Sequence, residues 1–211
     1  MHNRILRFLV CSIFMLILSG CLSVSRSPSP RYYKLDSMSQ QQIKERFKVA
    51  EDQIIGVGPV KIPEYLNRPQ ITTINNNMIT FAQFDRWAEP LDFAIARILN
   101  ENLILITEAK GIEMFPWNMM IPVRFQVVVD LIELDANMSE SLIFTAQWSI
   151  LDIRNKTLAF SKRSVLKEAV NPHDYSGVVK AMNTALSKIS IEIAGELSRL
   201  PIHENNVQRA G

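Results

Sequence analysis

Residues 123–131, VRFQVVVDL, decide the fold of this chain of 211 residues. From Val123 to Leu131 every second residue is apolar, and most of the residues between are polar. Such an alternation predicts a β-strand with one buried face. It returns in residues 142–150 and 157–169, and the turn-forming stretches DAN and RNK separate the three segments. The pattern therefore predicts an antiparallel meander that buries one face.

Two helices are predicted to cover this sheet. Residues 89–107 repeat apolar side chains at intervals of three and four, with Asn102 as the polar interruption. The second helix begins at Asp174, a favourable N-cap, and its apolar stripe continues to Leu200. Such a stripe fits either a coiled-coil seam or a core face, and a meander that needs a cover favours the core.

Shorter strands are predicted before the first helix. They span residues 53–60, 70–74 and 78–84, and an asparagine turn joins the last two as a hairpin. Phe81 and Phe84 are three residues apart, so either one of them is exposed or a bulge intervenes. We therefore expect an α+β fold, with antiparallel β-sheets covered by two amphipathic helices in two sheet-then-helix halves.

The N-terminus has the pattern of a secretory signal peptide over residues 1–20. Arg4 and Arg7 precede an apolar run over residues 8–18. As a helix this run would be about 17 Å long, which is too short for a hydrocarbon core about 30 Å thick. Small residues follow at positions 19 and 20. A cleaved export signal therefore explains the segment better than a membrane-spanning helix.

Cys21 directly follows this signal and could serve as a disulfide partner, a nucleophile, a metal ligand or an attachment point. No cysteine occurs after it, and Cys11 would leave with the signal. Residues 18–21, LSGC, resemble the bacterial lipobox. This resemblance implies an S-diacylglycerol group and an N-acyl chain on Cys21, and Leu22 at the next position implies delivery to the outer membrane. No cofactor beyond this lipid is predicted.

The mature chain is expected to have three parts. Residues 21–30 are rich in Ser, Pro and Arg and form a lipidated tether. Residues 31–202 form a single α+β domain in the periplasm, and residues 203–211 form a flexible tail. Removal of Arg4 and Arg7 leaves 21 basic and 21 acidic residues, without a long block of one sign. This balance argues against a nucleic-acid partner, which requires a basic face.

The sequence contains no motif for catalysis. His173 stands alone beside a turn, so no acid–base pair is indicated. The GVGP stretch at residues 56–59 lacks the remaining features of a phosphate-binding loop. The acidic residues at positions 85, 89 and 92 are explained by helix capping and a solvated surface. We predict no catalytic residue, no metal site and no enzymatic activity.

Four stretches resemble one family, the ABC-type transport auxiliary lipoproteins. In family order they are RYYKL (31–35), GVGPVKIPEYLNRPQI (56–71), RWAEPLDFAIARIL (86–99) and DYSGVVKAMNTALSKISIEIAGEL (174–197). The pieces PEYLNRPQ and WAEPL are the most specific. The segment 37–48 departs from the family, because it is longer and more polar.

The resemblance implies a non-catalytic auxiliary or docking subunit, held at the outer membrane by its lipid and facing the periplasm. Its partner would be an MCE-domain protein of a system that moves lipids between the two membranes. Two other interpretations remain open: a periplasmic carrier that binds lipid itself, and a structural lipoprotein of the cell envelope. A homo-oligomer is compatible with each of these.

Three residues of the specific pieces are candidates for partner binding: Tyr65, Arg68 and Trp87. Each also has a structural interpretation. Tyr65 and Arg68 precede Pro69 in a segment that suits a rigid turn. Trp87 could be an exposed interface anchor or a core residue beneath the first helix.

Overall fold

The computed structural model describes residues 7, 28–49, 53–75 and 77–200. Cys21, most of the predicted signal peptide and the tail 203–211 lie outside this described part. The chain divides into two compact units, Met1–Pro30 and Arg31–Gly211, and the second contains all the β-strands found among the described residues. Among the described residues, no helix is long and apolar enough to cross a membrane.

The main sheet has five strands in the order β5-β2-β6-β7-β8. These strands are β2 (Ile54–Lys61), β5 (Gly111–Met114), β6 (Val123–Ala136), β7 (Ser141–Asp152) and β8 (Thr157–Ala169). The predicted antiparallel meander is confirmed as β6-β7-β8. In contrast, β2 runs parallel to both of its neighbours, and its continuous apolar run suits a strand enclosed on both sides.

The second sheet has three strands in the order β1-β4-β3. β3 (Gln70–Asn75) and β4 (Met78–Trp87) form the predicted hairpin, and β1 (Arg31–Tyr33) pairs parallel to β4. The hairpin register shifts between Gln70 and Thr72, so the bulge that was one of the two alternatives for Phe81 and Phe84 is present. Phe81 is exposed, and Phe84 is half-buried.

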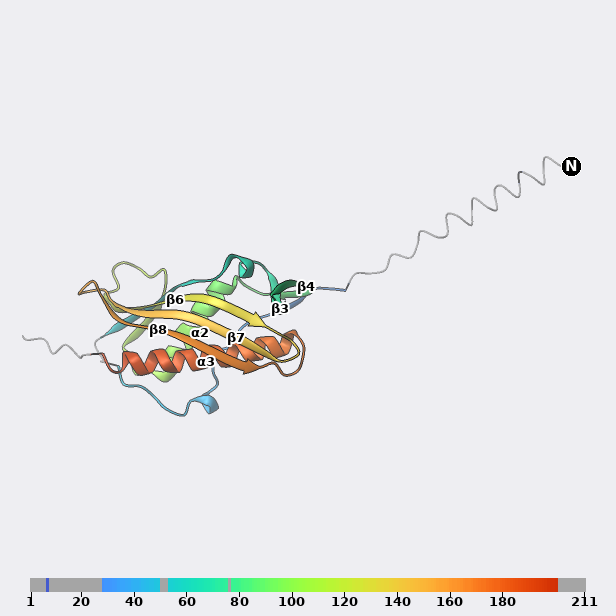
Figure 1. The fold of residues 1–211 in the computed structure, drawn as a ribbon. Helices are drawn as coiled ribbons and strands as arrows, with labels where there is room; N and C mark the ends of the chain where they lie inside the picture. The colour runs from blue at the N-terminus through green and yellow to red at the C-terminus, as the bar shows by residue number, and fades with distance from the viewer. Residues whose placement is uncertain (1–6, 8–27, 50–52, 76, 201–211) are drawn as a thin grey trace, which may run out of the picture. The chain divides into compact units, whose positions relative to one another are not determined.

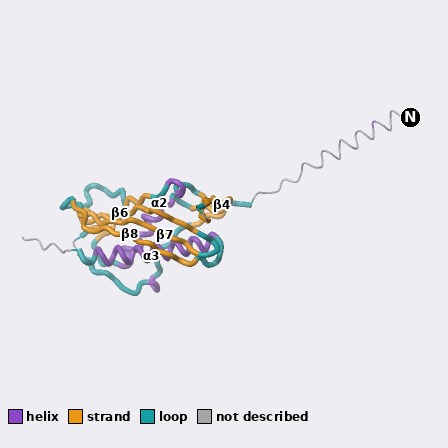
Figure 2. The backbone as a smooth tube through the Cα atoms, viewed as in Figure 1, coloured by secondary structure: helices purple, strands orange, loops and turns teal. Residues whose placement is uncertain are grey.

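Helices α2 (Leu91–Ile106) and α3 (Tyr175–Leu197) cover one face of the main sheet (Figure 1). Figure 2 marks these strands and helices by colour, with loops at both ends of the main-sheet strands. The stripe on α3 packs into the core and forms no coiled-coil seam, since Met182, Leu186 and Ile189 are fully buried. Trp148 of β7 is also fully buried in this layer interface.

Asp174 begins α3, as predicted, and its carboxylate accepts a hydrogen bond from the Gly177 amide at 3.0 Å. Gly177 lies against the backbone carbonyl of Pro172, which leaves no space for a Cβ atom. The turn and the first helical turn therefore pack at a distance that only glycine allows.

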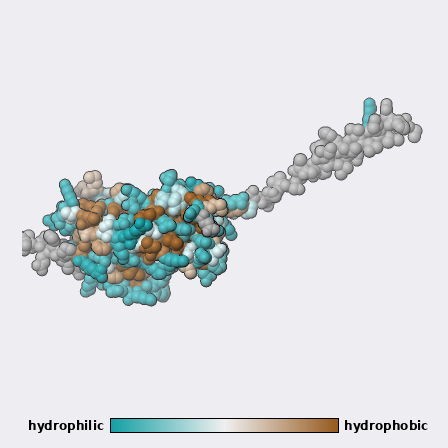
Figure 3. Space-filling model, in the orientation of Figure 1, coloured by the Kyte–Doolittle hydropathy of each residue, from teal (hydrophilic) through white to brown (hydrophobic). Residues whose placement is uncertain are grey.

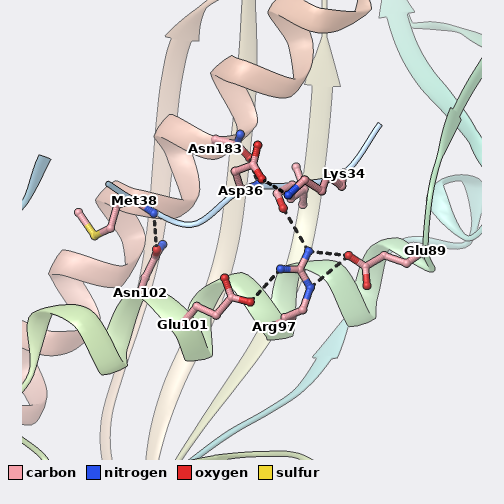
Figure 4. Close-up of polar contacts among 9 residues, drawn as sticks. Lys34, Asp36, Met38, Glu89, Arg97, Glu101, Asn102 and Asn183 are labelled. Atoms are coloured by element: carbon pink, nitrogen blue, oxygen red, sulfur yellow. Dashed lines mark hydrogen bonds and ion pairs between the residues drawn. The ribbon is translucent and has the colours of Figure 1, made fainter. Parts of the chain in front are cut away.

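The segment after β1 is held between the two helices (Figure 4). Leu35 and Met38 point into the core. The Met38 amide donates to Asn102 Oδ1 at 2.8 Å, and Asn102 Nδ2 donates to Ser190 Oγ of α3 at 3.1 Å. Arg97 of α2 donates to the Leu35 carbonyl at 3.1 Å. The Asp36 amide donates to Asn183 Oδ1 of α3 at 3.2 Å, so residues 35–38 are joined to both helices.

The predicted α+β class, with two helices covering sheets, is confirmed. Both sheets are mixed, because β1, β2 and β5 add parallel pairs to the antiparallel ones. The two sheet-then-helix halves follow each other along the chain but share a sheet, since β2 of the first half lies between β5 and β6 of the second. Two short 3-10 helices, η2 (Gln40–Gln42) and η3 (Glu64–Leu66), lie in the loops.

Candidate functional site

An open pocket of about 310 Å³ lies where two distant stretches meet. One wall is the turn at residues 67–69, and the other is the junction between β4 and α2 at residues 87–91. The Trp87 amide donates to the Pro69 carbonyl at 2.7 Å and holds the two walls together. The stretches PEYLNRPQ and WAEPL, which carry the family resemblance most specifically, therefore contribute to one site.

Local geometry fixes the first wall. The Leu66 amide donates to the Pro63 carbonyl at 2.9 Å, and the Arg68 amide donates to the Leu66 carbonyl at 2.8 Å. Prolines at positions 63 and 69 restrict φ on both sides. This explains why a short sequence can hold Arg68 at a fixed place in the wall.

Arg68 supplies the positive charge of the pocket. Its guanidinium carbon lies 3.8 Å from the centre of the Phe81 ring, which is a cation–π contact. Its Nε atom is buried and has no hydrogen-bond partner among the described residues. The other charged group in the lining, Glu89, is already paired with Arg97 at 2.6 Å. The pocket thus offers one cation that is available to an acidic group.

Trp87 lines the same pocket but is only 5% exposed. Its ring belongs to the core beneath α2, in agreement with the structural interpretation of this residue. Its exposed part, together with Pro69, Pro90 and Leu91, provides apolar surface in the lining. A partner side chain would therefore meet apolar groups beside the Arg68 guanidinium.

Tyr65 does not line this pocket. Its hydroxyl accepts a hydrogen bond from the Leu134 amide of β6 at 3.5 Å, and its ring packs on the core. Burial raises the pKa of this hydroxyl. The structure thus brings together two of the three predicted partner-binding residues, Arg68 and Trp87, and directs Tyr65 toward the main sheet.

The residues considered for catalysis have structural contacts. His173 Nδ1 lies 2.8 Å from the Met138 carbonyl oxygen at the surface. Asp85 contacts Arg31 and Tyr33, and Glu89 contacts Arg97. In the described ranges, no group of three His, Cys, Asp or Glu side chains could hold a metal ion.

The GVGP stretch also has a structural explanation. Gly58 has a φ of 104°, which favours glycine, and a Cβ on Gly56 would collide with the Trp117 ring. Trp117 belongs to the loop at residues 115–122 between β5 and β6, and this loop was not singled out from the sequence. Met119 and Met120 in it are 96% and 88% exposed, and the sequence signal for it was a mainly apolar stretch between two prolines.

Comparison with known proteins identifies the family. A sequence model described as the ABC-type transport auxiliary lipoprotein component matches residues 33–194. The chain belongs to this family. This auxiliary lipoprotein is therefore a component of ABC-type transport that is anchored in the cell envelope. The two walls of the Arg68 pocket both lie within the matched residues. Among curated proteins, none matches the sequence.

Solved structures share the fold of this auxiliary lipoprotein. The crystal structure of an uncharacterized protein has a TM-score of 0.64 at 17% identity, and the match covers 81% of this chain and 99% of that one. Protein XCC0632 from Xanthomonas campestris has a TM-score of 0.62 at 9% identity, with coverage of 81% and 95%. At such low identity the similarity establishes the architecture alone.

Proposed function

We propose that this protein is an outer-membrane lipoprotein that docks, without catalysis, onto an MCE-domain protein of an intermembrane lipid-transport system. The observation that carries this proposal is the Arg68 pocket, to which both specific family stretches contribute. Family membership supports an auxiliary role in transport. Leu22 after Cys21 supports delivery to the outer membrane.

The pocket suits a partner segment more than a lipid. Its volume of about 310 Å³ is at the lower end of the range for small-molecule pockets and is too small to enclose a phospholipid with two acyl chains. Its apolar lining with one adjacent cation fits a protein segment that presents an apolar side chain next to an acidic group. Docking is thus favoured over lipid binding at this pocket.

Site-specific crosslinking tests the docking role. A photoreactive amino acid at the exposed Asn67 position, in the pocket lining, should crosslink in intact cells to an MCE-domain protein that mass spectrometry identifies. The same group at Lys180, which is exposed on α3, is the matched control. Arg68→Glu should reduce the Asn67 crosslink at least about tenfold, because it reverses the charge offered to the partner. An identical product from Lys180, or none from Asn67, would count against the pocket as the docking site.

Membrane attachment is tested separately. The mature N-terminus should begin at Cys21 and carry three acyl chains in its mass spectrum. Cys21→Ala should abolish this modification, and Leu22→Asp should move the protein toward the inner-membrane fraction of a density gradient. An unmodified Cys21 in the wild-type protein would rule out the lipid anchor, whatever the pocket binds.

A further inference from the structure

The small sheet β1-β4-β3 has an outer face that the proposed docking role does not use. The strand register places Tyr32, Arg86 and Gln70 in one row across its three strands. The residues on either side of Arg86 in β4, Asp85 and Trp87, are buried. Because alternate residues of a strand point to opposite faces, the row lies on the side away from the core. Tyr32, at the edge of the row, is 65% exposed.

The hairpin continues this face with apolar side chains. Thr72 and Ile74 of β3 lie on the same side as Gln70, because every second residue of a strand shares a face. Their partners in β4 are Phe81 and Ile79, which are both exposed. Figure 3 shows apolar side chains among polar ones at the end of the molecule where β3 and β4 lie. The small-sheet face is defined here by four residues: Tyr32, Ile79, Phe81 and Arg86.

The exposed charge of this face is positive. The three strands contain a single acidic residue, Asp85, which is buried and paired with Arg31. Arg86 forms no ion pair within the described residues, and its buried Nε atom has no hydrogen-bond partner there. Phe81 is stacked against Arg68, so a second cation borders the face. The face thus combines aromatic, aliphatic and cationic groups without an exposed acid.

The position of the tether places this sheet close to a membrane. Arg31 is the first residue of β1 and of the compact unit. Ten residue steps separate it from Cys21, and a fully extended chain of this length spans at most about 36 Å. Lipidation of Cys21 belongs to the proposed function, and the present inference rests on it. The small sheet is the part of the folded unit to which the anchor is directly joined.

A second exposed apolar surface, the loop at residues 115–122, lies at the opposite end of the main sheet. This loop precedes β6, whereas Asn75 of the hairpin lines a pocket with Asp135 near the C-terminal end of β6 (Figure 1). β6 has 14 residues and is therefore about 46 Å long. With β6 upright on a membrane, the loop would touch lipid only if the small sheet stood farther away than the tether reaches. The tether therefore favours the small-sheet face.

We infer that the small-sheet face lies on the phospholipid surface of the membrane that holds the Cys21 lipid. Tyr32 and Ile79 contact the headgroup region, where amphipathic aromatic side chains are enriched. The Arg86 guanidinium donates to a headgroup phosphate, an acceptor that suits its fork of donors. Anionic lipids strengthen the contact, and salt weakens it.

The contact is weak by itself and depends on the anchor. A few side chains give only reversible membrane binding, whereas attachment through Cys21 keeps the face at a high effective concentration beside the lipid. Tyr32, Ile79 and Arg86 do not line the Arg68 pocket. Lipid contact and partner docking therefore use different residues and can be tested separately.

Purified protein on vesicles tests the contact without acylation or a transport partner. In the mature chain, a hexahistidine tag in place of Cys21 leaves no cysteine and holds each variant on vesicles that contain a nickel-chelating lipid. A fluorophore on Ile79→Cys should be quenched by brominated phospholipid in vesicles rich in phosphatidylglycerol. The same label on Met119→Cys, or on Ile104→Cys of α2, should be quenched far less, although both positions are exposed.

Substitutions in the labelled Ile79→Cys chain identify the groups that make the contact. Arg86→Glu should shift the equilibrium between quenched and unquenched protein at least about fivefold, which is the contribution of one basic residue near an anionic surface. Tyr32→Ser should shift it in the same direction. Lys180→Glu, a charge reversal on exposed α3, should leave it unchanged. Equal thermal unfolding of these variants would show that the quenching reports contact and not misfolding.

The competing occupants give different results. Stronger quenching at Met119 than at Ile79 would assign the membrane contact to the loop at residues 115–122 and overturn the inference. Absence of quenching at Ile79 would also overturn it, as would a photoreactive residue at position 32 that crosslinks in intact cells to a protein instead of phospholipid. Failure of the proposed docking is distinguishable, because it would abolish the Asn67 crosslink and leave quenching at Ile79 intact.

Discussion

Arg31 and Asp85 form an ion pair across β1 and β4, with 2.8 Å between Arg31 Nη2 and Asp85 Oδ2. The second oxygen of Asp85 accepts a hydrogen bond from the Tyr33 hydroxyl, also at 2.8 Å. Asp85 is buried, although the Arg31 side chain is largely exposed. Burial and the bond to Asp85 raise the pKa of Tyr33. One buried carboxylate thus fixes the first strand of the folded unit.

Asp85→Ala should loosen β1 without unfolding the protein. Two donors would lose their acceptor, and we expect a loss of about 1–3 kcal/mol in the free energy of unfolding. Hydrogen exchange should accelerate at residues 31–36, and denaturant titration should give the global change. Lys34→Ala is the matched control, because the Lys34–Asp36 pair is exposed on both sides. Loss of an exposed ion pair of this kind should lower the free energy of unfolding by less than about 1 kcal/mol. Equal effects of both substitutions would contradict the assigned role of Asp85.

Asn102→Ala should destabilise the packing of the two helices. Asn102 is fully buried, and its loss leaves the Met38 amide without its acceptor. We expect a loss of about 1–3 kcal/mol, measured by urea unfolding. Asn183→Ala is the control, since Asn183 accepts from the Asp36 amide at an exposed position and water can replace it. An Asn102 variant as stable as the Asn183 variant would show that the network is dispensable.

Gly177→Ala and Gly195→Ala should have opposite effects, although both lie in α3. A methyl group at Gly177 collides with the Pro172 carbonyl, so about 1–3 kcal/mol of stability should be lost as the turn shifts. At Gly195 the nearest atom that a new Cβ would meet outside its own helix is Phe47 Cε1 at 3.6 Å, an ordinary contact. Alanine is the better helix former there and should add about 0.5–1 kcal/mol. Thermal unfolding of the two variants gives the comparison, and a stabilised Gly177 variant would refute the close packing.

Asp174 should make the folded protein less stable as the pH falls into the acidic range. Hydrogen bonds from the Ser176 hydroxyl and the Gly177 amide lower the pKa of this carboxyl in the folded protein. Its contribution is therefore present above the unfolded pKa of about 3.9 and is lost as the pH falls through the folded pKa. The melting temperature of Asp174→Asn should decline less steeply below about pH 4 than that of the wild type. Parallel curves for the two proteins would exclude Asp174 as a source of this dependence.

Periodicity was sufficient to predict the meander and both helices. The strands β6, β7 and β8 alternate with period two, and the apolar stripe of α3 repeats at helical spacing, so each signal is contained in a short window. The partners of β1, β2 and β5 could not be predicted in this way. A parallel partner depends on which distant strand is nearby in the fold, and periodicity within one strand does not contain that information.

Two residues of the candidate site could be predicted from the sequence, but the pocket that they share could not. The resemblance selected Arg68 and Trp87, and the turn chemistry of PEYLNRP was readable from its prolines. That these residues share one pocket depends on the hydrogen bond from the Trp87 amide to the Pro69 carbonyl, which joins positions 18 residues apart.

The position of β2 has a consequence for the order of folding. Ile54 pairs with Val123, 69 residues further along the chain. β2 has no partner strand in the first half of the chain. It can pair only after β5 and β6, its two neighbours in the main sheet, are present. Such long-range parallel pairing slows folding and favours an all-or-none transition. A chain that crosses a membrane N-terminus first would thus remain unfolded until more than half of its length has emerged.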